Sequence, residues 1–116
     1  MKDDAVYRMP FSKIYPLLVA KVVRKGRTKE EADAVIRWLT GYSQAELDAL
    51  AESDAAYGAF FENAPAMNPK RLAVKGSICG VRVEEIQEPL MRDIRILDKL
   101  IDELAKGRPM EKVLRE

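Results

Sequence analysis

The chain has 116 residues, of which 47% are hydrophobic and 34% are charged, with 20 lysines and arginines against 19 aspartates and glutamates. This length and balance predict one folded domain over residues 1–116 and exclude a chain kept disordered by its own charge. A net charge of +1 gives no overall attraction to nucleic acid or to an anionic membrane, so such binding needs a local cluster of cations.

Two residue types limit the chemistry. The chain has no histidine and one cysteine, Cys79, so a Ser-His or Cys-His relay within the chain and the usual imidazole metal sites are excluded. One cysteine forms no internal disulfide, which is typical of a reducing cytoplasm. The first residues lack a signal-peptide pattern, and no apolar run is long enough to span a membrane. We expect a cytoplasmic protein with no cofactor, no metal site and no catalytic residue, and the sequence disfavours an enzyme without deciding the question.

The first predicted helix covers residues 11–25. Ser12 is its expected N-cap and Gly26 its stop. Pro16 falls in the expected first turn, where its missing amide hydrogen costs little.

Two capping boxes predict the next two helices. Thr28 with Glu31 gives the T-x-x-E pattern, followed by apolar residues at helical spacing up to Gly41. Ser43 with Glu46 repeats the pattern before a shorter apolar run.

The carboxyl half is predicted to be helical with one break. A short aromatic helix is expected over residues 54–64, and an apolar stripe with steps of three and four favours a helix over residues 68–87. A short strand near residues 77–83 is the alternative, because valine and isoleucine favour strands. A proline then starts a long helix over residues 89–106. Together these segments predict an all-α, compact bundle of five or six helices.

Cys79 lies between two glycines in the string GSICG. A nucleophilic cysteine needs a thiolate stabilised by a histidine, a helix N-terminus or a cation, and only Lys75 and Arg82 are near in sequence. A buried packing role is favoured, and a reactive thiol is the alternative.

The densest cluster of cations lies between residues 21 and 29. A helix, a short turn and a second helix also match the outline of a helix-turn-helix. Nucleic-acid binding through this cluster is therefore the alternative function, although acidic residues follow it closely. The candidate residues are Lys21, Arg24, Lys25, Arg27 and Lys29.

Aromatic residues in the middle of the chain suggest a site for a small molecule. Aromatic walls with one cation suit a small anionic ligand. The expected lining consists of Tyr42, Tyr57, Phe61 and Arg71.

The helix around Leu90 to Leu104 carries a wide apolar face. Surplus apolar surface would favour a homodimer through this helix, and filling of the chain's own core explains the pattern equally well. The function that these observations favour is a small helical binding or assembly module without catalytic activity. An enzyme of unknown reaction is the weakest alternative.

Three long strings resemble the bacterial family called domain of unknown function 2200. They are YRMPFSKIYPLLVAKVVRKGRTKEEADAVIRWLTGYS, FFENAP and CGVRVEEIQEPLMRDIRILDKLIDELAKG, and the similarity covers nearly the whole chain. The resemblance implies a small, mainly helical bacterial protein. Because the family has no assigned activity, it implies no catalytic residue.

Overall fold

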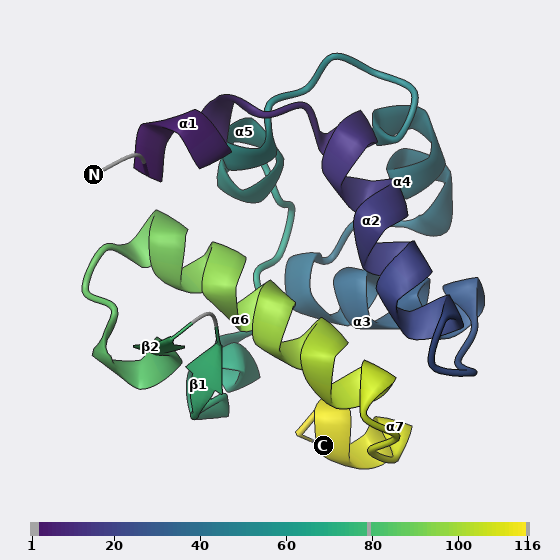
Figure 1. The fold of residues 1–116 in the computed structure, drawn as a ribbon. Coiled ribbons are helices and arrows are strands. Elements are labelled where there is room, and N and C mark those ends of the chain that lie inside the picture. The colour runs from purple at the N-terminus through teal and green to yellow at the C-terminus, as the bar shows by residue number, and fades with distance from the viewer. Residues whose placement is uncertain (1–2, 79, 116) are drawn as a thin grey trace.

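The longest described helix lies at the centre of the molecule. The computed structural model describes residues 3–78 and 80–115. Within them, helix α6 (Pro89–Ala105) crosses the middle of the fold, and α2 (Phe11–Val23), α3 (Lys29–Thr40) and α5 (Tyr57–Glu62) pack against it (Figure 1). The other α-helices of the described part are α1 (Asp3–Arg8), α4 (Gln44–Leu50) and α7 (Met110–Val113). The expected all-α class is confirmed, with seven α-helices in the described residues.

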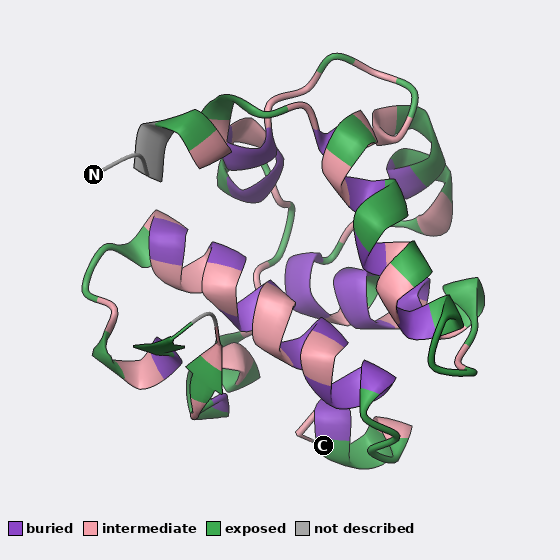
Figure 2. Ribbon diagram, viewed as in Figure 1, coloured by how far each residue is buried: buried purple, intermediate pink, exposed green. Residues whose placement is uncertain are grey.

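The core is built from one face of each packed helix. In α6, Ile94, Leu97, Ile101 and Leu104 are buried at steps of three and four residues, and Figure 2 shows buried positions recurring along this helix. Each such side chain contributes about 1.5–3 kcal/mol to folding when it leaves water. The helical pattern read from the sequence therefore corresponds to the faces that meet in the core.

Both predicted capping boxes form. The Glu31 amide donates to Thr28 Oγ1 at 3.1 Å, and the Thr28 amide donates to Glu31 Oε1 at 3.0 Å. The same reciprocal pair joins Ser43 and Glu46. The two helices therefore begin where these local signals predicted.

The expected N-cap at Ser12 and the expected start of the aromatic helix at residue 54 were wrong, because backbone contacts replace the expected side-chain caps. Helix α2 begins at Phe11, before Ser12, and contains Pro16, while α5 begins at Tyr57. The Phe11 amide donates to the Ala55 carbonyl at 2.9 Å, and the Tyr57 amide donates to the Met9 carbonyl at 2.7 Å. The two helices thus cap each other across the fold, a contact between segments far apart in sequence.

The helix favoured over residues 68–87 was wrong, and the strand alternative near residues 77–83 is confirmed. After a 3₁₀ turn, η1 (Pro69–Ala73), the chain forms a hairpin of β1 (Ser77–Ile78) and β2 (Val81–Arg82), then a second 3₁₀ turn, η2 (Val83–Glu85). Gly76 has a φ of 111°, a value outside any right-handed helix. That backbone conformation breaks the expected helix.

Candidate functional site

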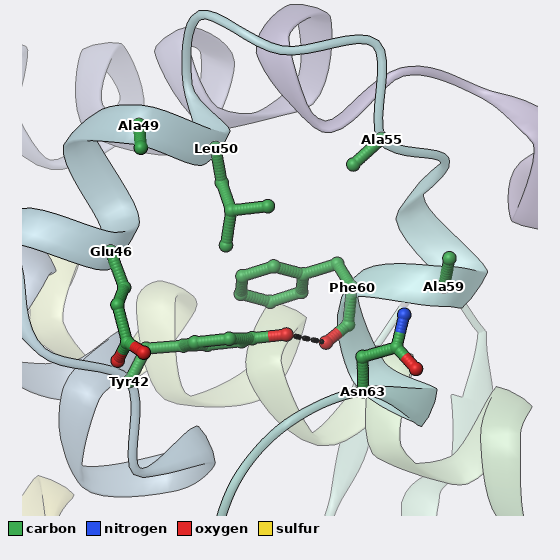
Figure 3. A pocket seen from close by; sticks show the side chains of 8 residues that line it. All are labelled: Tyr42, Glu46, Ala49, Leu50, Ala55, Ala59, Phe60 and Asn63. Carbon is green, nitrogen blue, oxygen red and sulfur yellow. Dashed lines mark hydrogen bonds between the residues drawn. The ribbon is translucent and has the colours of Figure 1, made fainter.

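A hollow opens on the surface between α4 and α5. Its volume is about 340 Å³. Figure 3 shows its walls, with Leu50 directed toward two stacked rings and the short alanine side chains leaving space between the helices. The lining residues are Tyr42, Glu46, Ala49, Leu50, Ala55, Ala59, Phe60 and Asn63.

A tight turn places Tyr42 in this hollow. Gly41 ends α3 with a φ of 81°, in the left-handed region. The Ala66 amide donates to the Thr40 carbonyl at 3.0 Å, which holds the segment after α5 against the turn. A Cβ on Gly41 would lie 2.8 Å from the Cβ of Ala66, so only glycine allows this approach.

Tyr42 and Phe60 form the aromatic part of the lining. Their ring centroids are 4.9 Å apart with an interplanar angle of 27°, and the Tyr42 hydroxyl donates to the Phe60 carbonyl at 2.7 Å. Phe60 also stacks on Phe11 of the core at 4.2 Å. Burial, with a smaller effect of the Glu46 carboxylate, raises the pKa of Tyr42. The Tyr42 ring is therefore held rigidly and stays uncharged at neutral pH.

The polar groups of the hollow are Glu46 and Asn63. The described lining contains no lysine or arginine. Glu46 Oε1 accepts the Ser43 amide at 2.7 Å and so is fixed at the rim by the capping box. The charge of the site is therefore negative, which favours a neutral or cationic group over an anion.

Of the four ligand residues expected from the sequence, only Tyr42 lines this hollow. Tyr57 and Phe61 are buried in the core at 2% and 3% exposure, next to each other in an edge-to-face contact. Arg71 donates through Nε to Asp93 Oδ1 at 2.8 Å and through a terminal nitrogen to the Asn68 carbonyl. The structure therefore does not bring the four side chains to one cavity.

Apart from Tyr42, the sequence singled out none of the lining residues as a site, Phe60 among them. The string AAYGAFFENA placed three aromatic residues together, but it did not tell which ring faces the hollow. The signal in the sequence that could have indicated a hollow here was the pair of small residues Ala55 and Ala59 on both sides of Tyr57.

Three of the five residues in the basic cluster form ion pairs with acidic residues of the same chain. Lys21 pairs with Asp102 at 3.3 Å, and Lys29 pairs with Asp33 at 2.7 Å. Arg27 pairs with Glu31 and also donates to the carbonyls of Leu104 and Arg108, at 3.2 and 2.9 Å, so it caps the carboxyl end of α6. Arg24 and Lys25 are exposed. Much of this cluster thus holds the fold together.

A buried carboxylate that the sequence did not mark joins α2, α3 and α4. Asp33 is 2% exposed and accepts hydrogen bonds from the Tyr15 hydroxyl, from Lys29 Nζ at 2.7 Å and from Gln44 Nε2 at 3.1 Å. Burial and then the bond to Asp33 raise the pKa of Tyr15 to about 12. The Asp33 carboxylate also raises the pKa of Lys29. Lys29 is therefore a structural cation and not a neutral amine nucleophile.

The apolar face of α6 packs into the protein's own core. Met91, Leu97 and Leu100 are buried at 6% exposure or less, and Leu90 is half-buried. The helix proposed for self-association thus faces the protein's own core.

Cys79 lies outside the described residues. In the described part of the chain, no three acidic, histidine or cysteine residues gather as a metal cluster would require, and no helix combines the length and apolarity needed to cross a membrane.

The fold and the hollow define a small, mainly helical protein with a surface hollow lined in part by aromatic rings. The chain belongs to the family described as "Uncharacterized protein conserved in bacteria (DUF2200)", whose profile matches residues 5–115. The resemblance seen in the sequence is thereby confirmed. The family description assigns no activity.

One solved structure supports the same fold. The chain is similar to the protein in the "Crystal structure of uncharacterized protein SP1917", with 48% sequence identity and a TM-score of 0.92, covering 97% of this chain and 93% of that chain. A search of curated proteins found no match to this chain.

Proposed function

We propose that this protein is a small helical binding module and that the hollow between α4 and α5 receives the apolar or aromatic part of a small ligand. The observation that carries the proposal is the rigid stack of Tyr42 on Phe60 beside a cavity of about 340 Å³. Apolar concave sites with a few fixed polar groups are the usual form of a ligand pocket.

The charge at the rim selects the ligand class. Glu46 is fixed by the capping box, and Asn63 supplies an amide at another point of the lining. A ligand with an aromatic or aliphatic body and an amine fits this arrangement, because the amine can pair with Glu46 while the body contacts the Tyr42 ring. This proposal replaces the anionic ligand expected from the sequence, since Arg71 lies elsewhere.

The proposal assigns binding and no reaction to the hollow. The Tyr42 hydroxyl donates to the Phe60 carbonyl, so it is committed to holding the site together. Its raised pKa makes it a poor base at neutral pH. Binding therefore depends on shape and charge.

The experiment is a nuclear magnetic resonance titration with two probes of the same body and opposite charge, phenethylamine and phenylacetate. We expect phenethylamine to shift amide resonances at Tyr42, Leu50 and Phe60, and phenylacetate to shift them much less. The Glu46→Gln variant keeps the capping box, because glutamine serves at that position, and removes the charge. It should weaken phenethylamine binding about fivefold, the effect of losing one partly exposed ion pair.

A matched pair of variants on α4 controls for the location. Ala49→Leu fills the hollow, whereas Ala45→Leu adds the same side chain at an exposed position of the same helix outside the lining. We expect only Ala49→Leu to abolish the shifts. The proposal is wrong if no shifts occur at millimolar probe, or if they persist unchanged in Ala49→Leu.

A further inference from the structure

Among the residues that the structure describes, no element covers the outer face of α2, which carries exposed apolar side chains. The inner face of this helix buries Phe11, Leu18 and Val22 in the core. On the outside, Leu17 is 66% exposed and Val23 is 51% exposed. Single exposed apolar residues are normal, but two on one short helix beside a hollow indicate a contact surface.

A second hollow lies along this helix. Its volume is about 390 Å³, and it is almost entirely apolar except for the Lys29 amine and the Tyr15 hydroxyl. Pro16, Ala20 and Val23 follow at steps of four and three, so they form one line along the helix. The small Ala20 side chain leaves room for an aliphatic side chain of a partner to insert, as a knob enters a hole between packed helices. The lining residues are Tyr15, Pro16, Val19, Ala20, Val23 and Lys29.

The surroundings of this face are positive. The sequence between residues 5 and 29 contains no aspartate or glutamate. Within the described residues, Lys21 is paired with Asp102 of α6, and Arg27 and Lys29 are paired with acids of α3. In contrast, Lys13, Arg24 and Lys25 are exposed and form no ion pair in that part of the chain. Three uncompensated cations therefore flank an apolar helix face.

We propose that this outer face of α2 docks an amphipathic helix of a partner protein, with aliphatic residues on its apolar face and acidic residues at its borders. The partner's aliphatic side chains enter the hollow at Ala20 and cover Leu17 and Val23. Its carboxylates pair with Lys13, Arg24 and Lys25. Helix-in-groove recognition uses this combination of apolar anchors at helical spacing with complementary charge at the rim.

The positive charge of this face favours an acidic partner helix over a second copy of the chain. A symmetric dimer through α2 would bring the same three cations of each copy to one interface, and like charges in an interface are repulsive. A flat anionic membrane would satisfy the charges, but it needs no hollow of about 390 Å³ between the side chains. The concave shape favours a helix with protruding side chains. This inference does not depend on the ligand hollow between α4 and α5.

The experiment uses two labelled helical peptides with leucines at i, i+3, i+4 and i+7. One carries glutamates at the flanking positions and the other carries lysines. Fluorescence anisotropy should show binding of the acidic peptide and no binding of the basic peptide. Reversal of the two charges in Arg24→Glu/Lys25→Glu should weaken the acidic peptide about tenfold and allow the basic peptide to bind.

Two controls make the test specific. Lys70→Glu/Lys75→Glu changes the net charge equally at exposed positions away from α2, and should leave both results unchanged. Leu17→Ser with Val23→Ser should abolish binding without unfolding the protein, because both side chains are exposed. Equal binding of both peptides, or equal losses in the two charge-reversal variants, would overturn the proposal. So would a dimer broken by Leu17→Ser, or binding to phosphatidylglycerol vesicles without binding to the peptide.

Discussion

Gly41 is the residue on which the geometry of the α4–α5 hollow depends. Its φ of 81° lies in the left-handed region, and the space where a Cβ would project is filled by Ala66. The same turn carries Tyr42 into the hollow. One glycine thus fixes both the end of α3 and the direction of Tyr42.

Gly41→Ala should lower the free energy of unfolding by about 2–3 kcal/mol, because left-handed backbone strain costs about 1–2 kcal/mol and the contact with Ala66 adds to it. Gly26→Ala is the matched control, since Gly26 has a φ of 87° but no atom within 4 Å of the Cβ position. It should cost about 1–2 kcal/mol, the strain alone. Urea denaturation followed by circular dichroism gives both values. Equal losses would show that the approach of Ala66 contributes nothing.

At the scale of the helix, α6 is stabilised at its carboxyl end by a residue from a distant loop. The last carbonyls of a helix lack intrahelical donors and carry a partial negative charge. Arg27 reaches the Leu104 and Arg108 carbonyls and is itself oriented by Glu31. The basic cluster that resembles a nucleic-acid site in the sequence therefore contains a helix cap.

Arg27→Ala should lower the free energy of unfolding by about 2–3 kcal/mol, because hydrogen bonds from a charged donor to two carbonyls are lost. Arg24→Ala, at an exposed neighbouring position, should change it by about 0.5 kcal/mol or less. Urea denaturation measures the two losses, and amide hydrogen exchange should accelerate at the end of α6 only in Arg27→Ala. A loss for Arg24→Ala as large as that for Arg27→Ala would contradict the capping role.

Elements with local signals were predictable and those set by distant contacts were not. The capping boxes at Thr28 and Ser43 act within four residues, so the sequence alone located them. The start of α5 depends on the Met9 carbonyl, which no local pattern reveals. The apolar stripe before α6 has the spacing of a helix. However, Gly76 adopts a φ of 111°, and the residues instead form a hairpin and 3₁₀ turns.

The candidate site was predictable only in part, for the same reason. Tyr42 follows a turn that the sequence marks with glycine, and it does line the hollow. Which of Tyr57, Phe60 and Phe61 faces that hollow depends on the rotation of α5 about its axis. That rotation is fixed by contacts with α1, α6 and α2. A string of aromatic letters therefore indicated the region and not the lining.

The whole molecule holds several phenol protons more tightly when folded than when unfolded. Burial first, and then Asp33, raises the pKa of Tyr15 to about 12, and burial raises the pKa of Tyr42 and Tyr57 as well. Unfolded tyrosine titrates near pH 10. The stability linked to these groups is thus fully present below about pH 10 and is lost as the pH rises toward their folded pKa values.

Thermal unfolding should accordingly show a falling midpoint between about pH 10 and pH 12. Tyr15 contributes about 1–2 kcal/mol of this loss, so Tyr15→Phe should have a shallower decline than the unchanged protein. The variant should be less stable at neutral pH, because the hydrogen bond to Asp33 is missing. Parallel pH profiles for the two proteins would show that Tyr15 ionises as it does in an unfolded chain.

The central position of α6 also affects how the protein is made. Ribosomes synthesise α2, α3 and α5 before α6, and a domain generally folds as a unit. Phe11, Leu39 and Phe60 therefore leave the ribosome before the helix that completes their burial. During that interval the nascent chain exposes the surface that chaperones bind. The burial of these side chains is complete only after α6 has emerged from the ribosome and packed against them.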